Sequence, residues 1–259
     1  MNSKETLGYL IKNKSSCVRF GDGEMTTIVG REHYFSKPNV QLSKRLVEVL
    51  SSDDSSLLVC VPSFLNEISS NGGWWKANLL FTRKYWNKYL NHDEVYGDAR
   101  ISRLNDGAGI RGDVRQVMGL WKELFVDQDI VMVEGNTTRF GMGNDLFEGA
   151  KKVRRILCPD VDAFDWHDQI LKTCLRQNKN VLFLVALGQA AKPLVFDLAS
   201  KGYRAIDVGH LDITYEWFLR GGRVKVPGKK VAEMKGDDEL GLFDNDELYL
   251  KQTIAKIES

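Results

Sequence analysis

Two carboxylate residues, Asp22 and Glu24, stand one glycine apart after an apolar segment, in the sequence Arg-Phe-Gly-Asp-Gly-Glu at residues 19–24. Carboxylate oxygens are the ligands that hard divalent cations prefer, and Gly23 allows the backbone to approach a phosphate closely. An Asp-Gly pair is also typical of an ordinary tight turn. The segment therefore predicts either a site for a cation and a phosphate or a simple turn between two elements.

A second group of polar residues follows another apolar segment, where Asp207, His210, Asp212 and Glu216 lie within ten positions. A histidine and three carboxylates at the end of a strand are costly to bury unless a cation or a substrate pairs with them. The alternative interpretation is a solvated loop whose histidine is hydrogen-bonded. We therefore regard this segment as the second candidate for chemistry.

Two further turns could contact an anionic substrate. Gly188 and Gln189 lie between an apolar segment and a predicted helix, where backbone N–H groups favour a phosphate. This turn has neither a G-x-G-x-x-G nor a G-x-x-x-x-G-K-S/T motif, which argues against a dinucleotide site and against a P-loop kinase. Residues 133–147 are rich in glycine and carry Arg139, which could clamp phosphate or carboxylate oxygens; the alternative is a structural loop.

These turns follow apolar, β-branched segments that alternate with helical segments along the chain. The apolar segments are residues 17–20, 57–61, 130–134, 155–158, 181–187 and 204–208. Such alternation predicts an α/β fold with a Rossmann-like, mostly parallel sheet flanked by helices. Gly202 is placed to end the helix that follows residues 181–187. Ligand sites in such sheets lie at the carboxyl ends of the strands, where the polar turns are expected to meet.

We expect residues 1–222 to form one catalytic domain. After Gly221 and Gly222 the composition shifts toward charged residues, and residues 223–259 are predicted to be a charged tail with a short helix that packs on or extends the same domain. The aromatic residues at 74–90 indicate a core or interface helix more than a ligand site.

The composition excludes several classes of protein. The 259 residues include 36 Lys and Arg against 35 Asp and Glu, so the net charge of +1 gives no electrostatic case for a nucleic-acid partner. The first residues are too polar for a signal peptide, and no stretch has the ~18 to 20 apolar residues of a membrane span. We therefore expect a cytoplasmic protein without a membrane span. The four cysteines show no C-x-x-C pair and are expected to pack as small apolar residues.

Three stretches resemble the GT-D-fold glycosyltransferases, bacterial enzymes that add hexoses to glycans, including those of serine-rich repeat adhesins. The stretches are RFGDGE, VEGNTTRFGMGNDLFEGAKKVRRILCP and LGQAAKPLVFDLASKGYRAIDVGHLDITYEW, which together run from residue 19 to residue 217. The chain differs from the family pattern in its phosphate turn, which reads LGQAA where LGPTA is common. The resemblance implies a GT-D-type fold and transfer of glucose or galactose from a UDP-sugar, in glycoprotein or surface polysaccharide synthesis.

The resemblance also implies roles for the candidate residues. Asp22 and Glu24 correspond to an Asp-x-Glu motif that holds a divalent cation, manganese or magnesium. His210, which stands among carboxylates after another strand, is the candidate third ligand. Arg19, Phe20, Gly21, Gly188, Gln189 and Arg139 are then expected to bind the donor. A cation that bridges two phosphates stabilises the leaving group, and a carboxylate must accept the proton of the acceptor hydroxyl. Glu216 is the preferred base and Asp212 the second candidate.

The expected partners are a UDP-hexose and a glycan acceptor on a protein or a lipid carrier, with association into homo-oligomers or glycosyltransferase complexes. Two other functions use the same residues. A metal-dependent phosphoesterase or nucleotide-sugar hydrolase would use the acidic groups to activate water. A noncatalytic sugar-nucleotide-binding subunit would use the aromatic segment around Trp74, Trp75 and Trp86 for assembly. The linkage, the stereochemical outcome and the acceptor do not follow from the sequence.

Overall fold

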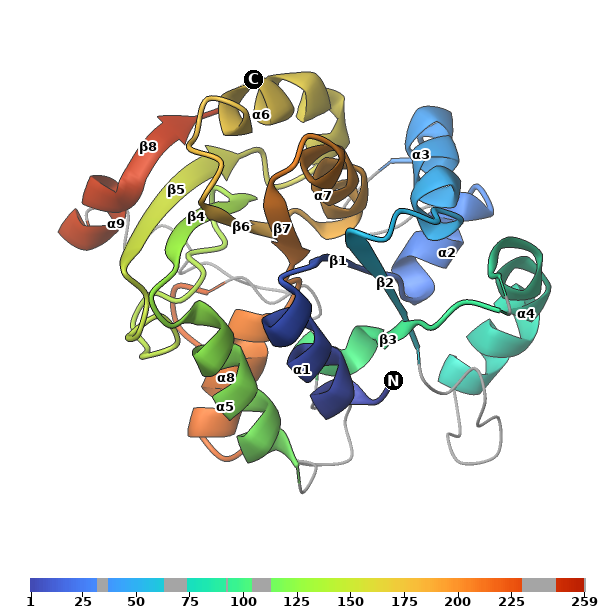
Figure 1. The fold of residues 1–259 in the computed structure, drawn as a ribbon, viewed down its shortest axis with the longest axis horizontal. Helices are drawn as coiled ribbons and strands as arrows, with labels where there is room; N and C mark the ends of the chain where they lie inside the picture. Colours follow the sequence, from blue (N-terminus) through green and yellow to red (C-terminus); the bar gives the residue numbers. More distant parts are fainter. Residues whose placement is uncertain (32–36, 63–73, 92, 104–112, 230–245, 259) are drawn as a thin grey trace.

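The structure is a computed structural model, and it describes residues 1–31, 37–62, 74–91, 93–103, 113–229 and 246–258, with side chains at 74–81 left aside. Within these residues the chain forms one parallel sheet of eight strands in the order β3-β2-β1-β7-β6-β4-β5-β8 (Figure 1). The strands are β1 Ser16–Arg19, β2 Leu57–Val61, β3 Gly97–Asp98, β4 Asp129–Gly135, β5 Lys152–Cys158, β6 Leu182–Ala186, β7 Arg204–Asp207 and β8 Thr253–Lys256. The predicted α/β class with a mostly parallel sheet is confirmed.

Helices cover both faces of the sheet (Figure 1). They are α1 Ser3–Asn13, α2 Asp22–Ile28, α3 Val40–Leu50, α4 Trp74–Tyr89, α5 Val114–Phe125, α6 His167–Cys174, α7 Ala191–Ser200, α8 Leu211–Leu219 and α9 Glu247–Gln252, with short 3₁₀ turns η2 Ala99–Ser102, η3 Ala163–Trp166 and η4 Gly188–Ala190. Alternate residues of β4 face opposite layers: Val131 and Val133 belong to the apolar cluster that includes residues of α3 and α7, whereas Ile130 and Met132 belong to the one that includes residues of α1, α5 and α8. This alternation builds two apolar layers on one sheet.

Local sequence signals explain where several helices begin and end. The side chain of Asn2 accepts a hydrogen bond from the backbone of Glu5, whose side chain accepts one from Asn2, and this capping box starts α1. Gly202 has a φ of +76° and follows α7, as predicted from the sequence. The described residues contain no helix that is long and apolar enough to cross a membrane.

The last described segment joins the sheet. The short helix expected within residues 223–259 is α9, six residues long, which leads directly into β8, and β8 pairs in parallel with β5 at the sheet edge. Tyr249 of α9 packs with Met142 and Leu157. Most of the predicted tail, residues 230–245, lies outside the described residues, as do the side chains of Trp74 and Trp75, whereas Trp86 is buried in the core. The division at residue 222 stays a prediction.

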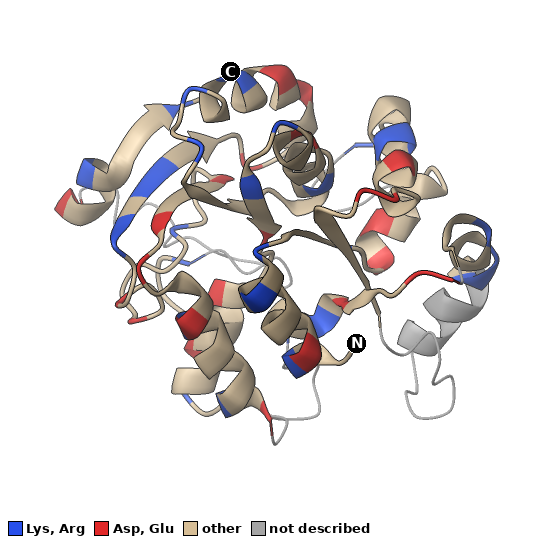
Figure 2. Ribbon diagram, in the orientation of Figure 1, with Lys and Arg blue, Asp and Glu red and all other residues tan. Residues whose placement is uncertain are grey.

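The connections create a crevice at the carboxyl ends of the central strands. The helices that follow β1 and β6, α2 and α7, lie on one face of the sheet, whereas α8, which follows β7, lies on the other. A reversal of this kind is where open α/β sheets bind ligands. Acidic and basic residues are interspersed along the described elements around it (Figure 2).

Candidate functional site

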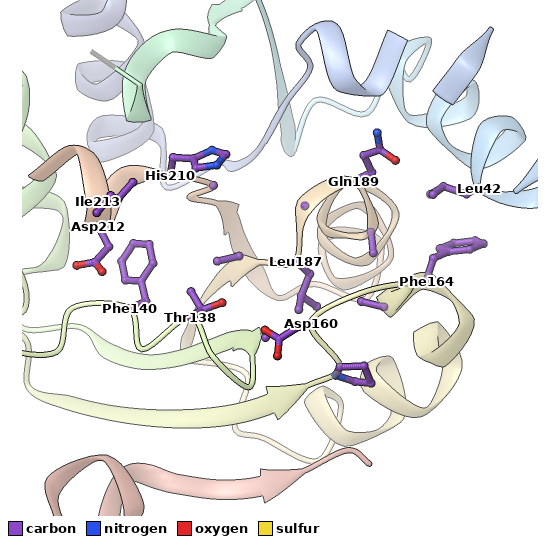
Figure 3. A pocket seen from close by; sticks show the side chains of 17 residues that line it. Leu42, Thr138, Phe140, Asp160, Phe164, Leu187, Gln189, His210, Asp212 and Ile213 are labelled. Atoms are coloured by element: carbon purple, nitrogen blue, oxygen red, sulfur yellow. The ribbon is translucent and has the colours of Figure 1, made fainter. Parts of the chain in front are cut away.

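A pocket opens at the carboxyl ends of β4, β5, β6 and β7 (Figure 3). Its wall consists of the turn after β6, the residues that follow the other three strands, the start of α8, one residue of α3 and two residues of η3. Four residues singled out from the sequence line it: Gly188, Gln189, His210 and Asp212. The expected meeting of the two βα turns in one crevice is therefore what the structure shows.

Beside the pocket, two carboxylates and two cations form what we call the strand-end ion cluster: Arg19, Glu24, Lys192 and Asp207. The Nζ of Lys192 lies 2.6 Å from Oε1 of Glu24 and 3.1 Å from Oδ2 of Asp207, and it donates a third bond of 3.0 Å to the carbonyl of Gly188. Arg19 donates from Nη2 to Oδ1 of Asp207 at 3.2 Å and from Nε to its carbonyl. The cluster joins the ends of β1, β6 and β7 to the start of α2.

The opposite charges within the strand-end ion cluster determine which of its four side chains are protonated. Burial alone would raise the pKa of Glu24 and of Asp207, but the charge of Lys192 on both, and that of Arg19 on Asp207, outweigh burial and hold both pKa values below their ordinary range. Burial would lower the pKa of Lys192, and its two carboxylate partners raise it instead. All four groups are therefore charged at neutral pH.

Gln189 connects the two segments that the sequence suggested for phosphate and cation. Its Nε2 donates to the carbonyl of Gly23 at 2.7 Å, and its Oε1 accepts from Oγ1 of Thr27 at 2.8 Å. The side chain is 2% exposed, so a lost bond there would leave a buried polar group without a partner. Gln189 thus fixes α2 against the turn that precedes α7.

His210 lies at the start of α8 and lines the pocket. Burial lowers the pKa of His210 to about 3, and the charges of Arg103, Arg19 and Lys192 act in the same direction. The imidazole is neutral at physiological pH and can offer a lone pair or an N–H group.

Gly209, next to His210, gives a direct test of how tightly Arg19 is held. Replacing Gly209 with Ala is expected to lower the free energy of unfolding by about 2 to 4 kcal/mol, from backbone strain and overpacking together. The backbone φ is +45°, and a Cβ there would stand 1.7 Å from Nη2 of Arg19, which could move only by leaving Asp207. Denaturant unfolding measures the loss.

The matched control is Gly202→Ala, because Gly202 has a φ of +76° but nothing within 4 Å of an added Cβ. It should show the strain alone, about 1 kcal/mol. Equal losses in the two variants would show that Arg19 is not fixed by its bonds to Asp207.

A second group of charges holds the two candidate bases on α8. Lys229 donates from Nζ to both carboxylate oxygens of Asp212 at 2.7 Å and lies 3.2 Å from Oε1 of Glu216. Asn144 donates to Oδ1 of Asp212 at 2.9 Å and to Oε1 of Glu216 at 2.8 Å. Arg220 pairs with the other oxygen of Glu216. Only Asp212 of this group lines the pocket.

The protonation of Glu216 follows from these partners. Burial would raise its pKa, but Asn144, Lys229 and Arg220 together lower the pKa below its ordinary value. Glu216 is therefore ionised at neutral pH and already engaged by three donors. Glu216 lies one helical turn beyond Asp212 and does not line the pocket, whereas Asp212 forms part of the pocket wall (Figure 3).

Four residues expected to bind a donor lie away from the pocket wall. Arg139 is 5% exposed, pairs with Asp246 at 3.1 Å and stacks over the ring of Tyr249. Phe20 is fully buried in the core, and the N–H of Gly21 donates to Oε2 of Glu24. Arg19 belongs to the strand-end ion cluster. These four residues shape the elements around the pocket, and their donor contacts stay predictions.

The predicted metal ligands, Asp22 and Glu24, stay a prediction, and a cation held by these two carboxylates would need its remaining ligands from a substrate. Asp22 and Glu24 both lie in the first turn of α2, and hard cations often take one or two carboxylates together with substrate phosphates. The ammonium of Lys192 already lies 2.6 Å from Oε1 of Glu24, so a cation bound here would share the carboxylate of Glu24 with Lys192. In the described part of the chain, no three or more His, Cys, Asp or Glu side chains are grouped closely enough to hold a metal ion. The role of His210 as third ligand stays a prediction.

Sequence reasoning did not identify Lys192, Lys229, Asn144 or the buried pair of Glu134 and Arg155. Lys192 follows Gly188 by one helical turn inside an apolar helix, an unusual place for a lysine, and this signal could have drawn attention to it. Nothing local marks Lys229 or Asn144, because their partners on α8 lie 13 to 17 positions from Lys229 and 68 to 72 positions from Asn144. Glu134 and Arg155 pair across neighbouring strands at 2.5 Å.

Comparison with known proteins identifies relatives over the whole chain. Residues 17–234 match the family model described as the glycosyltransferase GT-D fold. "Probable glycosyl transferase Gly" of Streptococcus gordonii is 35% identical over 266 residues, and "Glycosyltransferase GlyD" of Streptococcus pneumoniae is 31% identical over 264 residues. Each alignment covers 98% of this chain but only 38% and 32% of those proteins, so the chain spans about a third of their length.

Solved structures agree over the full chain. A protein from Streptococcus sanguinis described as a new glycosyltransferase has a TM-score of 0.90 and 33% identity, covering 100% of this chain and 98% of that one. A highly conserved domain described as having a distinct glycosyltransferase fold has a TM-score of 0.89 and 34% identity, covering 100% and 95%.

Proposed function

Because the chain belongs to the family of GT-D-fold glycosyltransferases, we propose that it transfers a hexose, glucose or galactose, from a UDP-sugar to a glycan acceptor. The observation that carries this proposal is the pocket whose wall holds both the Gly188–Gln189 turn and Asp212. The first is suited to a diphosphate and the second to a hydroxyl, so one cavity brings the two halves of a transfer reaction together. Bacterial glycoprotein or surface polysaccharide synthesis is the proposed setting.

The diphosphate of the donor would lie at the turn that precedes α7. Backbone N–H groups at a helix start carry partial positive charge, and Gly188 has a φ of +55°, a conformation that glycine adopts without strain. Asp22 and Glu24, fixed nearby through Gln189 and Lys192, are the residues that would hold manganese or magnesium. When bound, the cation would neutralise the charge that develops on the leaving diphosphate.

The acceptor hydroxyl would lie against Asp212. As its oxygen bonds to the anomeric carbon, the bond from that carbon to the diphosphate breaks, and the hydroxyl proton passes to the carboxylate. Lys229 and Asn144 keep Asp212 oriented into the pocket, and Glu216 holds the same two donors from one helical turn further along. We therefore assign the base role to Asp212 and a positioning role to Glu216, which the sequence had favoured as the base.

Acceptor dependence tests the proposed reaction. The chain incubated with UDP-glucose or UDP-galactose, manganese and a panel of glycan acceptors should release UDP at a rate that rises at least tenfold with the right acceptor, and EDTA should lower that rate. Chromatographic measurement of UDP and of glycosylated product checks both. Release at full rate without acceptor would instead establish a hydrolase, and donor binding without turnover across the panel would establish a noncatalytic subunit.

A further inference from the structure

Lys192 is a buried cation of the strand-end ion cluster, one helical turn from Gly188. Its Nζ contacts Oε1 of Glu24 and Oδ2 of Asp207 and donates to the carbonyl of Gly188, a residue that lines the pocket. An ammonium has three N–H donors, so one acceptor is present for each of them. Because the side chain is only 4% exposed, an acceptor that is lost must be replaced by another protein or ligand group to avoid an unpaired buried donor.

Glu24, one of the two predicted metal ligands, is already engaged at both carboxylate oxygens. Oε1 lies 2.6 Å from Nζ of Lys192, and Oε2 accepts the N–H of Gly21 at 2.8 Å. A divalent cation at Glu24 would therefore share the carboxylate with the ammonium or take its place. Two cations a few ångströms apart repel each other by more than about a tenfold change in affinity, even at the effective dielectric constant of a protein surface. Lys192 and a metal ion are thus competitors for Glu24.

The charges around the predicted metal site offer a free dication little net attraction. In the strand-end ion cluster the two carboxylates are balanced by Arg19 and Lys192, and Asp22 adds one further carboxylate. The positive charges of Arg103, Arg19 and Lys192 also act on His210, the candidate third ligand. A diphosphate would bring the negative charge that this surrounding lacks.

We propose that Lys192 makes metal binding conditional on the donor: it holds Glu24 until a diphosphate at Gly188 offers its ammonium another acceptor, so the protein binds a divalent cation together with the nucleotide and not alone. The inference rests on the proposed function, because it needs an anionic diphosphate at the turn before α7. Lys192 keeps Asp207 and the carbonyl of Gly188 throughout, so only one of its three contacts changes. Lys192 is therefore a positioning residue that couples the two ligands.

The charge of Lys192 makes the proposal testable by sign. If Lys192 competes with the cation, Lys192→Met tightens the binding of free manganese, by about tenfold or more. The same substitution weakens the binding of UDP without metal, because the diphosphate loses a nearby positive charge. If Lys192 only holds the strand ends together, a loosened site binds manganese no more tightly than before. The two interpretations therefore predict different changes in the affinity for manganese.

Calorimetry with manganese chloride alone, UDP alone and both together measures these changes, after correction for the manganese–UDP complex that forms in solution. In the unmodified chain UDP should strengthen manganese binding by about 10² or more, and manganese should strengthen UDP binding by the same factor. In Lys192→Met this factor should shrink about tenfold or more, because manganese alone already binds. Lys192→Arg keeps the charge and should keep the weak binding of free manganese. Lys201→Met, the same substitution at the exposed C-cap of α7, should match the unmodified chain.

Unfolding measurements keep the test informative if Lys192→Met is poorly folded. A ligand that binds only the folded state stabilises it, so manganese should raise the urea midpoint of Lys192→Met more than that of the unmodified chain. Adding Glu24→Gln should remove this gain, because an amide lacks the charge that holds a hard cation.

The outcomes separate the role of Lys192 from the transfer reaction. Tight binding of free manganese by the unmodified chain, or Lys192→Met with neither tighter manganese binding nor stabilisation by manganese, would overturn the role of Lys192 and leave the transfer reaction in place. Failure of the unmodified chain to bind UDP, or UDP binding that manganese never strengthens, would overturn the proposed metal-dependent donor site itself.

Discussion

Replacing Asp212 with Asn is expected to lower the rate of sugar transfer by about 10² to 10⁴, the range for a positioned general base. Asparagine has nearly the same shape and keeps an acceptor oxygen for Asn144, but it cannot take the proton of the acceptor hydroxyl. The diphosphate turn lies on another strand end, so donor affinity should stay close to that of the unmodified chain. Steady-state transfer kinetics and calorimetry with UDP, measured on the same preparation, separate the two effects.

Glu216→Gln is the informative comparison for this prediction. Glu216 shares Lys229 and Asn144 with Asp212 but does not line the pocket, so its substitution should cost much less than that of Asp212. Arg220 and Lys229 would lose an ionic partner, which makes a loss of stability the main expected effect. If Glu216→Gln transfers at 10² below the normal rate and Asp212→Asn is active, the base is Glu216, as the sequence first suggested.

The parts of the fold that the sequence predicted are those with local causes. Six of the strands follow from continuous apolar segments, because a strand buried on both faces needs apolar residues at every position. Gly202 could be placed because only a residue without a Cβ adopts its backbone conformation freely. The meeting of the turns after β6 and β7 followed from the rule that parallel strands present their carboxyl ends at one edge.

Two strands could not be predicted because they are defined by their hydrogen bonds to a neighbouring strand and their sequences lack a clear apolar pattern. β3 is only two residues long and is defined by its bonds to β2. β8 follows α9 directly, and its residues alternate between half-buried and exposed at the sheet edge. Edge strands of this kind carry little apolar signal, so the sequence predicts only a short helix in this part of the chain.

Arg139 shows why the partner of a charged residue is hard to predict. Its setting in a glycine-rich loop after a strand suggested a clamp for phosphate oxygens. In the structure it pairs with Asp246, 107 positions away, and stacks on Tyr249. Asp246 and Tyr249 lie at the start of α9 and within it, and the position of α9 against β5 depends on the pairing of β8. Local sequence indicates that a cation will need a partner, and the tertiary fold decides which one it receives.

Among the residues whose partners are distant in sequence, Lys192 is the one whose loss is expected to lower stability most. Replacing Lys192 with Met is expected to lower the free energy of unfolding by about 3 kcal/mol or more, because it leaves buried carboxylates without their cation. Arg19 still pairs with Asp207, so Glu24, which keeps only the N–H of Gly21 among its donors described above, should carry most of the loss. Urea denaturation at neutral pH measures it. Lys201→Met, at the exposed end of the same helix, should change stability by less than about 0.5 kcal/mol.

Acidification and a second substitution distinguish lost charge pairing from lost packing. The pKa values of Glu24 and Asp207 are lowered in the folded chain, so the stability they contribute is present above their unfolded values near 4 and disappears as the pH falls through the folded ones. Without Lys192 these pKa values rise, so the difference between variant and unmodified chain should be largest at neutral pH and shrink below about pH 4.

Adding Glu24→Gln to Lys192→Met should recover part of the loss, because no unpaired charge then remains at residue 24. A loss that is independent of pH, and that the double variant does not reduce, would mean that Lys192 acts through its methylene packing and that the ion cluster does not hold the strand ends together.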